Sequence, residues 1–265
     1  MLINLNGRRA AYDLFGPAGA PVVCMTHSLA SDSGMWAEQV PALLDAGYRV
    51  LRSDMRGHGG SEATPGEYTM QQLGDDLDAL LVALGVERIH LVGLSVGAML
   101  GMAFALARPE KLASLVLCDA QAASGSGARA AWSMPLAMVR QQGSLTPVAT
   151  GLLRAWLSDA YKAREPQRWQ QIRETILATP PAGFEGCVAA MSDFDFTAQL
   201  PSLGVPTLVL YGDGDPMTKP DENRRLAELI PGGQAEAIAD ARHFSNVEQP
   251  AAFNRVLLAW LGARR

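Results

Sequence analysis

The sequence predicts an α/β protein: a mostly parallel central sheet with helices on both faces and an inserted helical cap. Short apolar, strand-like runs alternate with helical periods over the first 120 residues, and this alternation resumes after about residue 205. Between them, residues 121–204 contain no convincing strand. We therefore expect a core domain formed by residues 1–120 and 205–265, interrupted by a cap formed by residues 121–204.

The first half of the chain supplies most of the predicted sheet. Continuous apolar runs such as residues 22–26 are typical of strands buried on both faces of a parallel sheet. The helix predicted over residues 69–84 has a leucine face and is followed by Gly85. By the same criteria we expect strands at residues 9–14, 22–26, 48–52, 89–94 and 115–118, and helices at residues 35–46, 69–84 and 96–107.

The insertion is predicted to consist of several helices. Glycine and proline residues separate its helical stretches, at Gly143, Pro166, Pro180, Pro181 and Pro201. After the insertion, we expect strands at residues 207–211 and 234–238 and helices at residues 222–229 and 250–261. The inserted segment therefore interrupts one domain.

The charge of the chain argues against polyanionic partners. Twenty-two Lys and Arg against 27 Asp and Glu give a net charge of −5, and no basic run is present. Affinity for nucleic acid or for anionic lipid needs a positive surface. We therefore expect no nucleic-acid partner and a small-molecule substrate.

The cysteines and the N-terminus indicate a reducing compartment. Cys24, Cys118 and Cys187 are odd in number and widely spaced, which disfavours a disulfide framework and a zinc site. No secretory signal is visible, so a cytoplasmic location is expected. Residues 91–107 carry no charge, but their two periodicities fit a buried strand turning into a buried helix better than a membrane span.

The segment Gly93–Leu94–Ser95–Val96–Gly97 matches the pattern G-x-S-x-G. It follows an apolar strand and precedes a helix, which is the context in which this pattern presents a nucleophilic serine on a strained turn. The glycines permit close packing of the turn. The first turn of the following helix directs free N–H groups and a positive dipole end at the same point.

A serine nucleophile needs a histidine base, and the chain offers four. His243 lies between the last predicted strand and the last helix, the position of the base when the order is serine, acid, histidine. His27 ends the second predicted strand and is the main alternative. His58, in a glycine-rich turn, and His90, on the strand before Ser95, are expected to be structural.

The acid is expected on a loop after a later strand. Asp215 is preferred because Pro216 fixes the loop exit and Gly214 lets the backbone turn inward. Asp213 in the same loop and Asp119 after the preceding strand remain alternatives, each with an ordinary structural explanation.

An oxyanion hole needs two N–H donors. Val96 is expected to supply one and Leu29, in the turn after the strand ending at His27, the other. No phosphate-binding loop, dinucleotide fingerprint or metal-ligand spacing is present in the sequence. We therefore expect neither a cofactor nor a metal.

These motifs together resemble those of the capped α/β-hydrolases and, among them, of the 3-oxoadipate enol-lactonase family. The resemblance covers nearly the whole chain and rests on residues 26–29, 35–36, 51–61, 93–97, 179–184 and 243–248. It implies Ser95 as nucleophile, Asp215 as acid, His243 as base, and Leu29 and Val96 as oxyanion donors.

The cap departs from the pattern of the family. The cap pattern of the enol-lactonase family has a Trp followed three residues later by Arg, and later an Arg-Trp pair. Here Trp132 is followed at that spacing by a proline, and Trp156 is preceded by an alanine. A carboxylate-bearing lactone would then need Arg140 or Arg154 as its bidentate partner. Trp132, Arg140, Arg154 and Trp156 are therefore the candidate substrate-binding residues.

The function predicted from these residues is hydrolysis of a small lactone or carboxylic ester through an acyl-enzyme, with 3-oxoadipate enol-lactone as the leading substrate and water as co-substrate. A promiscuous carboxylesterase or a cofactor-free perhydrolase would use the same triad. A ligand-sensing receptor on the hydrolase fold is the alternative of another class. The sequence predicts no oligomeric state.

Overall fold

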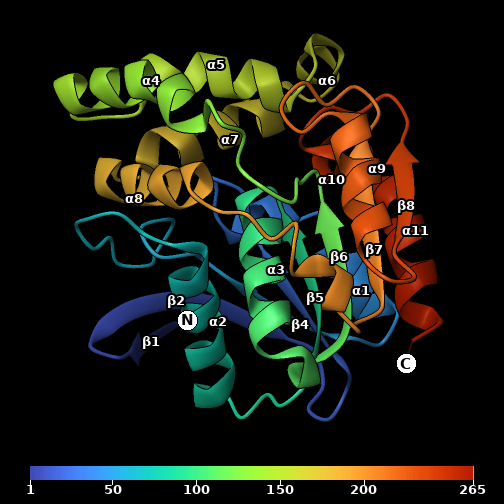
Figure 1. The fold of residues 1–265 in the computed structure, drawn as a ribbon. Helices are drawn as coiled ribbons and strands as arrows, with labels where there is room; N and C mark the ends of the chain where they lie inside the picture. The colour runs from blue at the N-terminus through green and yellow to red at the C-terminus, as the bar shows by residue number, and fades with distance from the viewer. Residues whose placement is uncertain (265) are drawn as a thin grey trace.

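The computed structural model describes residues 1–264 and shows one eight-stranded sheet (Figure 1). The strand order is β1-β2-β4-β3-β5-β6-β7-β8. Strands β3 to β8 run parallel, while β1 and β2 join the edge by antiparallel pairing. The strands are β1 (Leu2–Leu5), β2 (Arg8–Phe15), β3 (Val22–Thr26), β4 (Arg49–Ser53), β5 (Ile89–Leu94), β6 (Leu112–Cys118), β7 (Thr207–Gly212) and β8 (Gln234–Ile238).

Helices cover both faces of this sheet and one of its ends. In Figure 1, α2, α3 and α9 lie in front of the sheet, and α1 and α11 lie behind it. The core helices are α1 (Val40–Asp45), α2 (Met70–Ala83), α3 (Val96–Ala107), α9 (Pro220–Leu229), α10 (Ser245–Glu248) and α11 (Pro250–Gly262). The α/β class predicted from the sequence is confirmed.

The inserted segment forms a helical cap. It contains α4 (Ala128–Gln142), α5 (Thr146–Trp156), α6 (Asp159–Arg164), α7 (Pro166–Ala178) and α8 (Pro181–Ser192). These helices lie above the end of the sheet to which the arrowheads of β6 and β8 point (Figure 1). The cap therefore covers the carboxyl ends of the parallel strands, where α/β proteins place their ligands.

Cap and core meet closely at two glycines. Gly57 has a φ of +76°, and a Cβ atom on it would lie 2.3 Å from the Cα atom of Gly183. Gly183 belongs to α8, and Gly57 to the core loop after β4. A side chain at either position would push the cap away from this loop.

Two sequence expectations need correction. The helix predicted over residues 35–46 is divided into a 3₁₀ turn, η1 (Ser33–Trp36), and α1. The side chain of Asp32 caps the turn by accepting the Gly34 N–H, and Pro41 begins a new helix because its ring suits a first helical turn. Strand β1 was not predicted, because its residues are few and its pattern largely exposed.

The uncharged segment at residues 91–107 divides between β5 and α3, and both are buried. This confirms the strand-then-helix interpretation. Among the helices of residues 1–264, none combines the length and the hydropathy needed to cross a bilayer.

Candidate active site

Ser95 lies on the sharp turn between β5 and α3. Its φ of 56° and ψ of −121° are a strained combination for a residue with a side chain. The turn is held because the Ser95 N–H donates to the carbonyl of Cys118 at 2.9 Å. A Cβ atom on Gly93 would lie 2.3 Å from the carbonyl oxygen of Gly97, so the serine turn requires glycine there. The predicted nucleophile is thus held at the carboxyl end of β5.

Gly97 brings the first turn of α3 against the end of β3. A Cβ atom on Gly97 would lie 2.4 Å from the carbonyl oxygen of Thr26, whose hydroxyl donates to the Gly97 carbonyl at 2.9 Å. Among the described residues, the N–H groups of Val96 and Leu29 donate to no protein acceptor, although both residues are buried. Buried N–H groups normally have partners, so these two are available to an oxyanion.

The predicted acid and base contact each other directly. His243 Nδ1 lies 2.8 Å from Asp215 Oδ2, and both side chains are almost completely buried. The Thr218 hydroxyl donates to the same carboxylate oxygen at 2.6 Å, and the Met217 N–H donates to Oδ1 at 2.7 Å. This arrangement fixes the orientation of the imidazole ring.

The electrostatics of this pair suit an acid that orients a base. Burial alone would raise the pKa of Asp215, but the charge and hydrogen bond of His243, with those from Thr218 and Met217, hold that pKa below its ordinary value. Asp215 is therefore an anion at neutral pH. The other ring nitrogen, His243 Nε2, is buried and has no partner among the described residues. It is the atom free to exchange a proton with a nucleophile.

Asp119 lies beside the pair but has different partners. It accepts the Gly212 N–H at 2.8 Å and the Ser245 hydroxyl at 2.6 Å, so both its oxygens are bonded away from the imidazole. Burial, and then the nearby charge of Asp215, raise the pKa of Asp119 well above its ordinary value. Asp119 thus joins the end of β7 to the loop of His243 without contacting His243 Nδ1.

Asp119, Asp215 and His243 offer ligand atoms that lie within 4.8 Å of one another. A metal ion would need those lone pairs free. Here the carboxylate oxygens already accept hydrogen bonds from an imidazole, two hydroxyls and two backbone amides. This donor set therefore fits a hydrogen-bonded network better than a metal centre.

Asp213, the other candidate acid, lies in the turn after β7. Its residue is exposed, and its N–H donates to the carbonyl of Ile238 at 3.0 Å. Its place in the structure is that of a turn residue.

The three remaining histidines use their ring nitrogens structurally. His27 Nε2 accepts the Met55 N–H at 2.8 Å, and its Nδ1 lies 2.7 Å from the Ser28 carbonyl, so neither nitrogen is free. His58 Nε2 accepts the Ala30 N–H at 3.0 Å.

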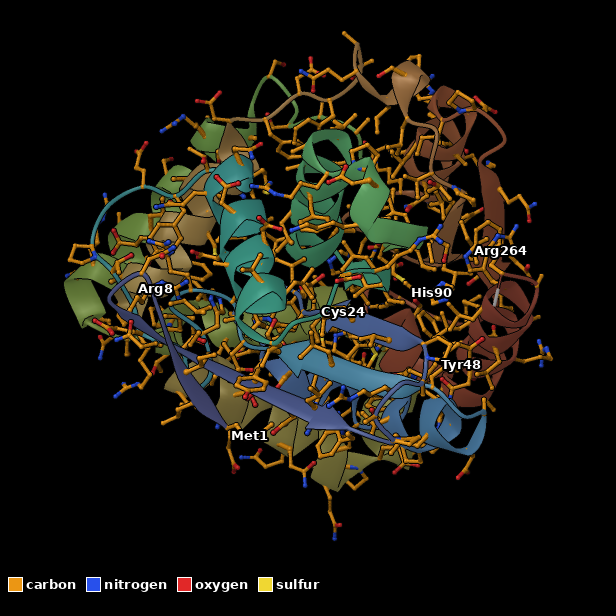
Figure 2. The ribbon with its side chains drawn as sticks, turned by 90° about the horizontal axis from the view of Figure 1, so that it is seen from below. Met1, Arg8, Cys24, Tyr48, His90 and Arg264 are labelled. Carbon is orange, nitrogen blue, oxygen red and sulfur yellow. The ribbon has the colours of Figure 1, made fainter. Side chains whose placement is uncertain are left out.

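His90 lies near the opposite end of the sheet. Figure 2 views the molecule from that end, where the rings of His90 and Tyr48 form a T-shaped pair with centroids 6.0 Å apart. His90 Nδ1 lies 2.9 Å from the Ser114 hydroxyl. His90 is a packed core residue, far along β5 from Ser95.

The neutral histidines predict acid sensitivity of the fold. Burial lowers the pKa of His90 from 6.5 to about 4 and that of His58 from 6.5 to about 3. Between these values and 6.5 the unfolded chain binds protons that the folded chain does not. The free energy of unfolding is therefore unaffected by these groups above pH 6.5 and falls as the pH drops below it.

We expect His90→Gln to lose part of this pH dependence, because glutamine does not titrate. Urea unfolding midpoints measured from neutral pH to pH 4.5 test this, and the variant should show the shallower decline. Equal declines for both proteins would contradict the assignment of His90 as a neutral buried group.

The four candidate substrate-binding residues fall into two separate places. Trp132 and Arg140 line a cavity of about 620 Å³ between α4, α8 and residues 65–67. Arg140 Nε is paired with Glu185 Oε2 at 2.8 Å, and its side chain is 63% exposed. This cavity is lined by no member of the predicted triad.

Arg154 and Trp156 lie on α5 at the other end of the cap. Arg154 is exposed, and its carbonyl accepts a hydrogen bond from the guanidinium of Arg242. Trp156 is 1% exposed, and its ring stacks on that of Phe244 with centroids 4.5 Å apart. The structure thus brings Trp156 to the neighbour of His243 but brings neither arginine to the triad.

Two contributors were missed from sequence. Thr218 supports the acid, and its position three residues after Asp215 is the kind of short spacing at which a hydroxyl reaches back to a carboxylate. Glu248 belongs to the segment 243–248 on which the family resemblance rests, but no role was predicted for it, although it is a buried carboxylate five residues after His243. No local sequence pattern predicts that this carboxylate is buried near His243.

The chain is similar in sequence and in fold to known proteins. Residues 21–250 match the family model of the alpha/beta hydrolase fold. The chain belongs to this family. It is 32% identical over 248 residues to 3-oxoadipate enol-lactonase 2 of Acinetobacter baylyi, covering 94% of this chain and 91% of that protein.

Two solved structures are similar over nearly the whole chain. The enol-lactonase of Burkholderia xenovorans is 33% identical with a TM-score of 0.93, covering 99% of this chain and 100% of that one. A malate-bound thermophilic esterase of Thermogutta terrifontis is 32% identical with the same TM-score, covering 99% and 98%. The protein is therefore an α/β-hydrolase, and the resemblance to enol-lactonases predicted from its motifs is confirmed.

Proposed function

We propose that this protein hydrolyses small lactones or carboxylic esters through an acyl-enzyme on Ser95. The observation that carries the proposal is the contact of His243 Nδ1 with Asp215 Oδ2 at 2.8 Å, which leaves Nε2 unpartnered at the edge of the sheet where Ser95 is held. A serine becomes a useful nucleophile when such an imidazole takes its proton.

In the first half-reaction the Ser95 hydroxyl attacks the carbonyl carbon and passes its proton to His243 Nε2. The oxyanion accepts the N–H groups of Leu29 and Val96, and its collapse expels the alkoxide or enolate, which takes the proton from the imidazolium. A lactone then remains attached as an opened acyl chain. Water repeats the same steps and releases the carboxylic acid.

The burial of the site supports a closed reaction chamber. Ser95 is 3% exposed and His243 is 1% exposed beneath the cap. Excluding bulk water strengthens the hydrogen bonds to the oxyanion and protects the leaving group. Entry of substrate therefore requires movement of the cap or of the loops around it.

The leading candidate substrate is 3-oxoadipate enol-lactone. This candidate is supported by the similarity of the chain to an enol-lactonase of Acinetobacter baylyi, at 32% identity. The proposed triad would serve an ester and an enol-lactone alike.

A second candidate is an uncharged lactone or ester. The placement of the arginines favours it, because Arg140 is engaged by Glu185 and Arg154 is exposed to solvent. A bound carboxylate would normally be held by an arginine that is free to make a bidentate contact.

From this placement we expect Arg140→Gln and Arg154→Gln to change KM for 3-oxoadipate enol-lactone by less than about threefold, the effect of a weak exposed charge. Steady-state kinetics with the enol-lactone, an uncharged γ-lactone and p-nitrophenyl acetate test this, and the two neutral substrates serve as internal controls. A rise in KM of about tenfold or more for the anion alone would instead assign carboxylate recognition to that arginine and support the enol-lactone.

A further inference from the structure

The loop that carries the proposed base is attached to the cap. We call residues 242–248 the histidine loop. The Phe244 N–H donates to the carbonyl of Trp156 at 3.0 Å, and the two rings are stacked at 4.5 Å with an interplanar angle of 11°. The Phe244 ring in turn lies 6.1 Å from the ring of His243. The Phe244 ring thus lies between the cap residue Trp156 and the imidazole of His243.

A single buried carboxylate completes this attachment. Glu248 is 1% exposed, and its Oε1 accepts the N–H of Ser158 at 2.7 Å. Its Oε2 accepts the N–H of Arg242, the residue immediately before His243. Ser158 caps the N-terminus of α6, so the two oxygens of one side chain bond one amide of the cap and one of the histidine loop.

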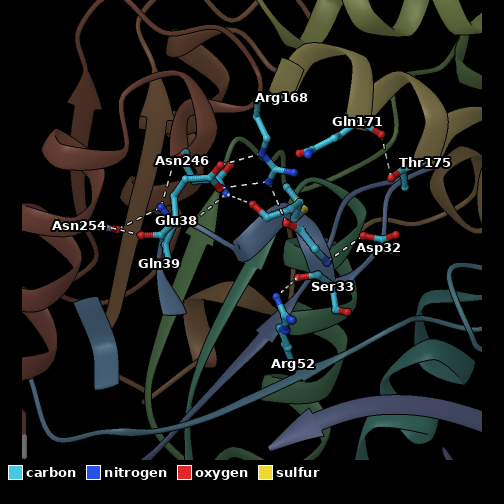
Figure 3. A network of polar contacts seen from close by, with 12 residues as sticks. Asp32, Ser33, Glu38, Gln39, Arg52, Arg168, Gln171, Thr175, Asn246 and Asn254 are labelled. Carbon is cyan, nitrogen blue, oxygen red and sulfur yellow. Dashed lines mark hydrogen bonds and ion pairs between the residues drawn. The ribbon is translucent and has the colours of Figure 1, made fainter. Parts of the chain in front are cut away.

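Two more bonds lead to the cap: Arg164 of α6 donates to the Glu248 carbonyl at 2.7 Å, and the Arg242 guanidinium donates to the Arg154 carbonyl. The remaining anchors of the histidine loop lead to the core. Ser245 donates to Asp119, and the Asn246 side chain donates to the Met35 carbonyl at 3.0 Å and to Gln39 at 3.1 Å (Figure 3). These bonds hold the loop from the sheet side. Glu248 and Phe244 hold it from the cap side.

We propose that Glu248 is a positioning residue that couples docking of the cap to the orientation of His243. The inference rests on the proposed function of His243 as base. With both amides satisfied, the backbone at Arg242 is fixed, and the imidazole keeps Nδ1 on Asp215 and leaves Nε2 without a protein partner. If the bridge is broken, one buried amide loses its partner and the loop relaxes. Small displacements of a catalytic group reduce turnover even though every reacting group is still present.

The first test compares Glu248→Gln with Glu38→Gln. Glutamine has one acceptor oxygen, so its amide group faces one of the two N–H donors. Glu38 is a control of the same chemistry: its carboxylate accepts from Arg168 of α7 at 2.7 Å and 3.1 Å, a cap-to-core ion pair that shares no hydrogen bond with the histidine loop (Figure 3). Turnover of p-nitrophenyl acetate is expressed per Ser95 titrated with a fluorophosphonate, so that misfolded protein does not count.

For Glu248→Gln we expect kcat to fall about 10- to 100-fold, with KM changed less than about threefold. Glu38→Gln should leave both quantities at wild-type values.

A second pair of variants isolates the cap half of the bridge. Ser158 has a φ of −74°, which proline adopts, so Ser158→Pro removes the N–H given to Glu248 without forcing the backbone. Ser158→Ala removes only the hydroxyl that caps α6 at the Tyr161 N–H. Ser158→Pro should lower kcat per titrated site several-fold more than Ser158→Ala does.

A wild-type kcat in Glu248→Gln, or equal losses in the two Ser158 variants, would overturn the inference while leaving the proposed triad in place. A wild-type protein that neither reacts with the fluorophosphonate nor hydrolyses the ester would defeat the proposed function and the inference with it.

Discussion

Ser95→Ala is expected to abolish turnover, with kcat falling roughly 10⁶-fold, as serine hydrolases lose when the nucleophile is removed. The loss follows because no other hydroxyl occupies the strained turn between β5 and α3. The remaining oxyanion donors, Leu29 and Val96, still polarise a bound carbonyl, so a small rate above that in water should persist. Active-site labelling by a fluorophosphonate should disappear together with turnover.

The control for this experiment is Ser114→Ala. Ser114 is also a buried serine on the sheet, but it lies on β6 beside His90, away from the turn. This variant should keep both labelling and turnover. Labelling that persists in Ser95→Ala, or that vanishes in Ser114→Ala, would place the nucleophile elsewhere.

The fold could be predicted because its signals are local. Each buried strand of the parallel sheet is a short apolar run, and β3, β5 and β7 are buried along their whole length as such runs require. Strand β1 and the turn η1 were missed for the opposite reason. Their structure depends on pairing with β2 and on the Asp32 cap, which apolar periodicity does not record.

The contact between the proposed acid and base could be predicted because chain order and strand ends determine which loops meet. Ser95, Asp215 and His243 each follow a strand whose carboxyl end lies at the capped edge of the sheet. The preference for Asp215 over Asp213 depended on the direction in which the backbone turns at Gly214. The support given by Thr218 and Glu248 depends on side chains that meet after folding, at distances in sequence that no motif fixes.

The cap was predicted least well at the level of single residues. Its helical nature follows from composition and from the placement of proline and glycine, but the direction in which each helix presents its residues depends on packing. Trp156 is turned toward the histidine loop, whereas Arg140 and Arg154 are turned outward. The residues of an inserted segment that face the site can therefore be identified only from the structure.

Asp215→Asn is expected to lower kcat by about 10⁴-fold, the loss found when an orienting carboxylate becomes an amide. An asparagine that donates to His243 Nδ1 would favour the wrong tautomer, with the proton on Nε2, and that nitrogen could then no longer accept the proton of Ser95. The change also removes the negative charge that stabilises the imidazolium formed during attack. Folding should survive because the Met217 N–H can still donate to the amide oxygen, and the Thr218 hydroxyl can turn to accept from the amide N–H.

Asp213→Asn makes the same chemical change two residues away, on an exposed turn residue. It should lower kcat less than about threefold, as expected for a surface substitution that touches no reacting group. The two variants are compared by steady-state kinetics with p-nitrophenyl acetate, at a pH where the wild-type rate no longer changes with pH. If Asp213→Asn were the more damaging, the acid would have to be reassigned. If both lost equally little, Asp119, whose carboxylate lies within 4.8 Å of the imidazole, would become the candidate for the acid.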